Sequence, residues 1–262
     1  SRILATADAD ADAAPRLNTE LMTGLRPTLY LVQLSNLLAG NISIIHKATG
    51  SSRTFKGEEM AGVSAIKNAV DRIKAGQGDL FLVGGALNAE REDFLLGCEL
   101  TGSLYRGPHQ SVWDRQGEND GFIPGSVGLF IVLESSSHAK ARGAMPYAQI
   151  GGIASDRSPR APGDIAATAS TLLKELPLDT SNRELFVMSG ASGVRATTAE
   201  ELQFLSDVQK AGIEPVIRAW GSIFGHTHEA HFLVGIALAA LALSKSEFYP
   251  PFDTSGVEHT RK

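Results

Sequence analysis

The sequence predicts an α/β fold with a largely parallel or mixed sheet, because short apolar runs alternate with longer segments of helical periodicity. The run at 80–83 (Leu-Phe-Leu-Val) lies between Asp79 and a Gly-Gly pair, as expected for a strand buried on both faces. Apolar residues at helical spacing predict a helix from Glu58 to Ala75, which Gly76 ends. Further strands are predicted at 127–133, 147–153, 185–188 and 215–218, and further helices at 136–142, 164–176, 198–211 and 226–244.

The N-terminal part of the chain carries weaker signals. Residues 1–26 include an Ala/Asp alternation at 6–12 and show neither helical nor strand periodicity, so they are expected to form a loop or mobile arm. A helix is predicted at 28–39, ending near Gly40. An internal boundary is predicted near 142–146, where the sequence Ala-Arg-Gly-Ala-Met-Pro separates two units.

Composition limits the classes of function. The chain has 262 residues, of which 43% are hydrophobic, enough for a large core in one domain or two fused halves. Its formal charge of −5 argues against nucleic-acid binding and membrane-surface binding, which favour basic faces. No long apolar run predicts a membrane span and no secretory signal opens the chain, so a cytoplasmic location is expected. The single cysteine, Cys98, excludes an internal disulfide and a cysteine-based zinc cluster.

Three stretches of the sequence occur in a characteristic order and spacing. Together they resemble the β-ketoacyl-ACP synthases, over roughly residues 37–243. The first stretch is 37–44 (Leu-Leu-Ala-Gly-Asn-Ile-Ser-Ile), followed by Gly50. The second begins with Trp-Asp-Arg at 113–115 and Asp-Gly-Phe at 120–122, and continues through the run 128–134 into 138–144 and Tyr147-Ala148. The third is Ser-Ile-Phe-Gly-His at 222–226, before an Ala-rich helix. The middle stretch is the most specific of the three.

The resemblance implies a thiolase-like layered αβαβα architecture made of two similar halves, and a dimer. Residues 1–145, after the arm at 1–26, would be part of the N-terminal ketosynthase half, and residues 146–262 part of the C-terminal half. The family's first strand–helix units and its glycine-rich C-terminal segment have no counterpart in the sequence, so the architecture is expected to be incomplete at both ends. The implied chemistry joins an acyl chain to malonyl-ACP with loss of CO2 and needs no cofactor.

The nucleophile position of the family is the most informative departure. A condensing enzyme holds its acyl chain on a cysteine at a helix N-terminus, where the thiol pKa is lowered. Aligned between Gly50 and Gly62, that position here is Glu59. A carboxylate is a poor acyl carrier, because its acyl adduct would be a water-labile anhydride. Taken without the family, Glu58 and Glu59 would simply be acidic residues that cap a helix.

The other catalytic positions of the family are mostly changed. His226 matches the second histidine, which would donate a hydrogen bond to the thioester oxygen as negative charge develops. The position of the first histidine is occupied by Gly190, and that of the lysine by Gly221. Outside the family, a histidine before an apolar helix is more often structural.

Several other groups have simpler interpretations. His226, His228 and His231 are close in sequence but do not form a zinc-binding motif, so no metal site is predicted. Cys98 is interpreted as a small core residue. Lys56, together with Arg53, could face an acidic carrier protein or be ordinary solvated charges.

Two functions follow from the resemblance. The favoured one is a non-condensing subunit similar to chain-length factors, which pairs with an active ketosynthase or with itself and works with an acyl carrier protein. The edge strand of that dimer would lie at about 51–55. The alternative is an enzyme in its own right, a 3-oxoacyl-ACP synthase or a malonyl-ACP decarboxylase. A coenzyme A thiolase is disfavoured, because such enzymes use a second cysteine and the sequence has one.

Overall fold

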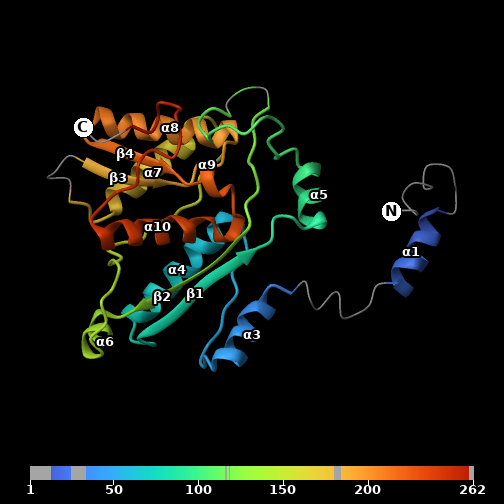
Figure 1. Ribbon diagram of the computed structural model, residues 1–262, viewed down its shortest axis with the longest axis horizontal. Coiled ribbons are helices and arrows are strands. Elements are labelled where there is room, and N and C mark those ends of the chain that lie inside the picture. The colour runs from blue at the N-terminus through green and yellow to red at the C-terminus, as the bar shows by residue number, and fades with distance from the viewer. Residues whose placement is uncertain (1–12, 25–33, 116, 118, 180–183, 260–262) are drawn as a thin grey trace. The chain divides into compact units, whose positions relative to one another are not determined.

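The computed structural model describes residues 13–24, 34–115, 117, 119–179 and 184–259 (Figure 1). The chain divides into two compact units between Thr54 and Phe55. The N-terminal unit contains helices α1 (Ala13–Gly24) and α3 (Asn36–His46), and the C-terminal unit contains every other described element. Part of the predicted arm (1–12, 25–26) and part of the predicted helix (28–33) lie outside the described residues.

The predictions for the N-terminal unit were wrong in two places. Residues 13–24, predicted as part of a mobile arm, form helix α1. The helix predicted to stop near Gly40 instead runs through this glycine as α3 and ends at His46, where Lys47 adopts a left-handed conformation (φ 54°). A glycine inside a helix costs only about 1 kcal/mol relative to alanine, so it need not end one when apolar residues continue beyond it.

The C-terminal unit contains two small sheets. Strands β1 (Leu80–Leu87) and β2 (Val127–Glu134) pair antiparallel, and β3 (Glu184–Ser189) and β4 (Glu214–Ala219) pair parallel. These confirm four of the five predicted strands. The strand predicted at 147–153 was wrong, because this segment lacks regular secondary structure. An extended segment becomes a strand only beside a hydrogen-bonding neighbour, and the described residues offer this one none. The edge strand at 51–55 was predicted to pair with a partner chain, and it stays a prediction.

The helices of the C-terminal unit follow the predicted periodicity closely. The predicted helices correspond to α4 (Glu59–Lys74), α6 (Ser136–Ala141), α7 (Asp164–Glu175), α8 (Arg195–Lys210) and α10 (His231–Lys245). The last one was predicted to begin at His226, but a short 3₁₀ turn, η2 (His228–Ala230), precedes it. Helices α5 (Glu92–Leu100) and α9 (Gly221–Phe224) were not predicted, since both are short and contain glycine.

Helix α10 is the central element of this unit (Figure 1). It contacts α4 and β2 on one side and β3 on the other, while α8 packs on β4 with α7 beside it. This is the layered helix–sheet arrangement that the resemblance implied. Two apolar cores result, one between α4, α10 and the β1–β2 sheet around Ile66, Val83 and Leu233, and one beneath α8 around Leu205 and Ile217. Among the described residues, no helix combines the length and apolar character needed to cross a bilayer.

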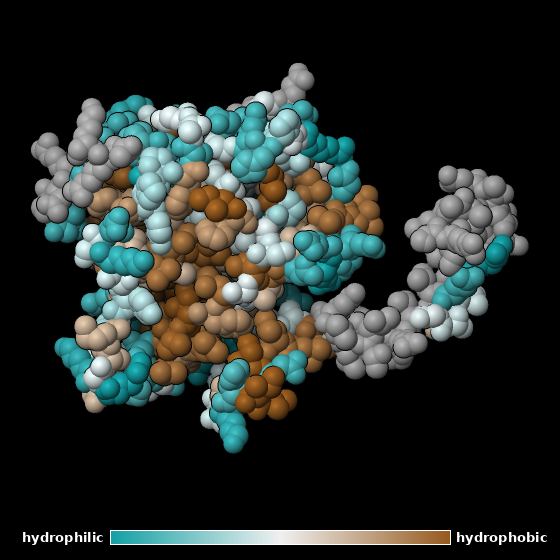
Figure 2. Space-filling model, in the orientation of Figure 1, coloured by the Kyte–Doolittle hydropathy of each residue, from teal (hydrophilic) through white to brown (hydrophobic). Residues whose placement is uncertain are grey.

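The β1–β2 sheet buries only one face. Val83 and Leu133 point into the core, whereas Leu80 and Leu82 on the opposite face are 50% and 47% exposed. The prediction that β1 is buried on both faces was therefore wrong for the described residues, because none of them covers this side. Apolar surface is also prominent over the region of α10 in the space-filling view (Figure 2).

Candidate functional site

The site begins at the turn that leads into helix α4. Glu58 has φ 53° and ψ −137°, a conformation that residues with a side chain rarely adopt, and Glu59 immediately after it is the first helical residue. Such strain is found where surrounding structure fixes the backbone, often at functional sites. The strained turn presents the Glu59 side chain at the N-terminal end of α4, and this end packs against η2.

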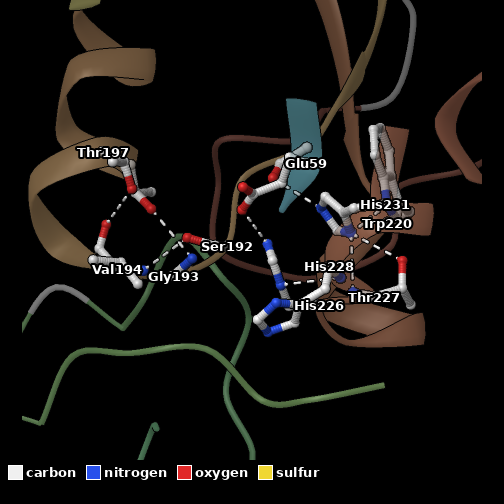
Figure 3. Close-up of polar contacts among 12 residues, drawn as sticks. Glu59, Ser192, Gly193, Val194, Thr197, Trp220, His226, Thr227, His228 and His231 are labelled. Carbon is white, nitrogen blue, oxygen red and sulfur yellow. Dashed lines mark hydrogen bonds and ion pairs between the residues drawn. The ribbon is translucent and has the colours of Figure 1, made fainter. Parts of the chain in front are cut away.

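Glu59 contacts His226 directly (Figure 3). Its Oε1 lies 2.6 Å from His226 Nε2, although 166 residues separate the two in the chain. The backbone N–H of His228 donates to the other ring nitrogen, His226 Nδ1, at 3.4 Å. Because Nδ1 accepts, the ring hydrogen is on Nε2, which donates to the Glu59 carboxylate. The donor that would face a thioester oxygen in a condensing enzyme is thus bonded to a side chain of the protein.

Glu59 is ionised at neutral pH. Partial burial alone would raise its pKa, but the hydrogen bond from His226, together with the electrostatic attraction of that ring, outweighs burial and lowers the pKa to about 2. The side chain nevertheless remains 49% exposed, so its charge also reaches solvent. A permanent negative charge at the helix N-terminus is the result.

The loop before η2 fixes His226 in place. Its backbone N–H donates to the Ile123 carbonyl at 2.7 Å, and its own carbonyl accepts from Gly125 N–H at 3.0 Å. A Cβ at Gly125 would overlap the Phe224 carbonyl, and Gly225 has φ +69°, so both glycines permit the two segments to cross. The glycines of two separate motifs therefore serve one purpose, the placement of His226.

Gly190 lies at the end of β3, on the other side of the histidine cluster. Its carbonyl accepts a hydrogen bond from His231 Nε2 at 3.0 Å. A Cβ at this position would lie 3.5 Å from both His231 and Trp220, an ordinary contact. Gly190 therefore borders the site through His231 but contributes no side chain to it.

Gly221 has no room for a side chain. It is the first residue of α9, and a Cβ there would lie only 2.6 Å from the Ala191 carbonyl oxygen and 3.0 Å from a methyl group of Val112. A lysine therefore cannot replace it without a backbone shift. Of the four predicted site residues, the structure brings Glu59 and His226 into contact, places Gly190 one ring away, and packs Gly221 against Ala191.

A groove of about 420 Å³ opens beside Glu59. Most of its wall is apolar, and Glu59 and His231 are its ionisable lining residues. The lining consists of Glu59, Met60, Val63, Met188, Gly190, Trp220, His231, Phe232, Gly235, Ile236 and Ala239.

Three residues near the site were not predicted to take part. His231 stacks on His226 with ring centroids 4.4 Å apart, and Trp220 packs on His231 at 4.9 Å. Arg115 is buried and donates to the carbonyls of Gln110 and Ser192, which anchors the loop after β3. His231 follows His226 closely in the sequence and comes directly after the η2 turn, but no motif assigns it a role.

The three neighbouring histidines form a ring cluster. His226 is edge-on to His228 at 4.9 Å and stacked on His231. Among the described residues, no group of three or more His, Cys, Asp or Glu side chains is arranged to hold a metal ion. Cys98 is buried in α5, where burial raises the pKa of its thiol. The side chain that hydrogen-bonds His226 Nε2 is Glu59.

Comparison with known proteins gives a consistent result. The sequence profile of the β-ketoacyl synthase N-terminal domain matches residues 7–139. The chain is 32% identical to 3-oxoacyl-(acyl-carrier-protein) synthase 2 of Rhizobium meliloti over 143 residues, covering 53% of the chain and 34% of that protein. It is 27% identical to the tetracenomycin polyketide synthase ketoacyl synthase beta subunit of Streptomyces glaucescens over 211 residues, covering 78% of the chain and 51% of that protein.

Solved structures show the same likeness in three dimensions. The ishigamide ketosynthase/chain length factor matches with a TM-score of 0.70 and 26% identity, covering 89% of this chain and 59% of that one. A β-ketoacyl synthase from Burkholderia phymatum matches with a TM-score of 0.68 and 21% identity, covering 90% and 60%. The chain thus spans between a third and about half the length of the curated relatives described here, and its fold is that of thiolase-like ketosynthases.

Proposed function

Because the chain belongs to the β-ketoacyl synthase family, we propose that it is a ketosynthase-like subunit that does not condense acyl chains itself. It acts in fatty acid or polyketide biosynthesis in the cytoplasm, in the manner of a chain-length factor. Its partners are an active ketosynthase, with which it dimerises, and the acyl carrier protein that serves the pair.

The hydrogen bond between Glu59 and His226 carries this proposal. Condensation needs a nucleophile that forms a thioester and a free histidine donor that stabilises the enolate oxygen. Here the residue at the nucleophile position is an ionised carboxylate, and it already occupies the Nε2 donor of His226 at 2.6 Å. Both requirements are lost through the same contact.

The packing of the other two family positions supports the same conclusion. A lysine at Gly221 is excluded by the Ala191 carbonyl, and Gly190 supplies only a carbonyl, which His231 binds. A site that had lost only its nucleophile would keep space for the lysine. The backbone contact at position 221 therefore favours a non-condensing role. The apolar groove remains and could form part of an acyl tunnel shared with a partner.

The relatives support a partnered role. One curated relative is named as a ketoacyl synthase beta subunit, and one structural relative is a ketosynthase/chain length factor. Charge is compatible with this role as well: the ionised Glu59 repels the malonyl carboxylate that a condensing site must bind.

The test is to purify the protein from its native cells and weigh the intact complex by native mass spectrometry. The expected result is a heterodimer with a second ketosynthase-family chain that has a cysteine at the nucleophile position. Condensation of acyl-ACP with malonyl-ACP should then require the partner's cysteine and survive Glu59→Ala in this chain. Strong condensing activity of this chain purified alone would overturn the proposal.

Malonyl-ACP decarboxylation is the alternative, and one observation favours it: the Nε2–H of His226 is present and aimed into the site. The ionised Glu59 opposes it, so Glu59→Gln is the informative variant. Release of CO2 from malonyl-ACP by the isolated chain, increased by Glu59→Gln and abolished by His226→Ala, would establish this activity. No release from either protein leaves the subunit role as the supported one.

A further inference from the structure

The rings of His231 and Trp220 border the position that a side chain at residue 190 would enter. A Cβ on Gly190 would lie 3.5 Å from atoms of both rings, so alanine would fit and a larger side chain would have to share this space with them. His231 comes from the opposite direction, at the N-terminal end of α10.

We propose that His231 supplies the second imidazole of this site in place of the absent histidine at position 190, and that it acts as a positioning residue for His226. The inference rests on the proposed function only in taking position 190 as the family's histidine position. The arrangement of the two rings is independent of any partner or substrate.

The hydrogen bonds of His231 fix its tautomer (Figure 3). Nδ1 faces three donors, Trp220 Nε1–H at 3.2 Å and the backbone N–H and hydroxyl group of Thr227, each at 3.3 Å. Nε2 faces the Gly190 carbonyl at 3.0 Å and must donate to it. Both nitrogens are therefore engaged, and the ring has no donor left for a substrate. This separates a positioning role from a catalytic one.

Burial keeps His231 uncharged. The residue is 3% exposed, and burial, followed by repulsion from His226, lowers its pKa to about 4. A neutral ring can stack on His226 at 4.4 Å without charge repulsion. With the two rings only 29° from parallel, the stack holds the plane of the His226 ring and resists its tilting. This is the plane in which Nε2 faces Glu59.

The experiment uses ¹⁵N-labelled protein and long-range ¹H–¹⁵N correlation spectra of the histidine rings. In the native protein, His226 should give one tautomer, with hydrogen on Nε2. His231→Ala should produce a mixture of tautomers or exchange-broadened signals from His226. His231→Gln should have the same effect, because glutamine has no ring to stack on His226. Its amide can still donate to the Gly190 carbonyl, so this variant provides the test if the alanine variant does not fold.

Leu205→Ala is the matched control, since it removes a buried side chain from the other apolar core. It should lower the melting temperature and leave the His226 signals unchanged. An unaltered single tautomer in folded His231→Ala or His231→Gln would overturn the proposal. These spectra need neither partner nor substrate. If the subunit role proved wrong, the result for His231 would still stand, and if the positioning role proved wrong, the subunit role would be unaffected.

A second, independent measurement exchanges the two positions. Gly190→His should lower the melting temperature strongly in the native background, because its ring meets His231 and Trp220. In a His231→Ala background the same change should cost less, giving clear non-additivity between the two sites. Equal losses in both backgrounds would show that the two imidazoles do not compete for one space.

Discussion

The carbonyl oxygen of Ala191 lies 2.6 Å from the point at which a side chain on Gly221 would begin. Ala191 is in the loop after β3 and Gly221 begins α9, so the contact joins the ends of the two parallel strands. A glycine is therefore required here for packing, whatever the chemistry of the site. The contact leads to the first prediction.

Gly221→Ala should destabilise the protein by about 1–3 kcal/mol, the usual cost of overpacking a filled core, and Gly221→Lys by more. Urea denaturation measures the change. Gly97→Ala is the control, because a Cβ there meets nothing within 4 Å and α5 should gain slightly from a better helix former. A Gly221→Ala protein as stable as the native one would show that the loop after β3 yields easily.

The Glu59 carboxylate should stabilise the fold only above acidic pH. Its folded pKa of about 2 lies below its ordinary value of 4.5, so its contribution is present above pH 4.5 and is lost as the pH falls toward 2. The side chain is half-exposed, which limits the effect to about 1 kcal/mol or less. Urea denaturation of native protein and Glu59→Gln should show a small difference at pH 7 that vanishes near pH 2–3. A difference that grows on acidification contradicts the assigned pKa.

His231 should make the protein sensitive to mild acid. Its folded pKa of about 4 lies below the ordinary 6.5, so the unfolded chain takes up a proton first and stability falls between pH 6.5 and 4. Glu59 partly counters this effect, while His226 and His228 add to it through repulsion. The expected loss is about 3 kcal/mol. In His231→Gln, denaturation curves over this range should show a clearly smaller loss, and an unchanged pH profile would assign the loss to other groups.

The buried carboxylate of Glu258 should be essential for the segment that follows α10. It accepts backbone N–H groups of Ala219 and Phe252, each at 2.7 Å, and Trp113 Nε1–H at 3.3 Å. Glu258→Gln presents an amide group to one of these donors, so the expected loss of stability is about 1–3 kcal/mol. Trp113 fluorescence during urea denaturation reports it. Exposed Glu247→Gln should change little, and equal effects of both variants would contradict the role of this network.

Much of the fold could be predicted because its signals are local. The helical spacing from Met60 to Ile73 reflects the face that α4 buries, and the apolar run of β1 reflects its pairing with β2. Residues 147–153 have the same apolar character but form no strand, since a strand depends on a neighbour that local sequence does not specify. The prediction that the outer face of β1 is buried was wrong for the same reason. The sequence shows that a residue is apolar but does not show which segment covers it.

The site was predictable where residue identity carries the chemistry. The family resemblance placed Glu59 beside His226, and the structure brings them into contact. His231 and Trp220 were missed because their role depends on which ring fills a space, which follows from packing between β3, β4 and α10. That Gly221 leaves no room for a lysine likewise follows only from the position of the Ala191 carbonyl.

The crossing of two chain segments at Gly125 and Gly225 has a consequence for how this sequence can evolve. Each glycine is required because the backbone of the other segment passes beside it, so neither can gain a side chain while its counterpart stays in place. Substitutions at one cannot be rescued by a change of side chain at the other. In a library that samples every amino acid at every position, both should remain fixed even in selections for folding alone, and drift in this region should be confined to the residues around them.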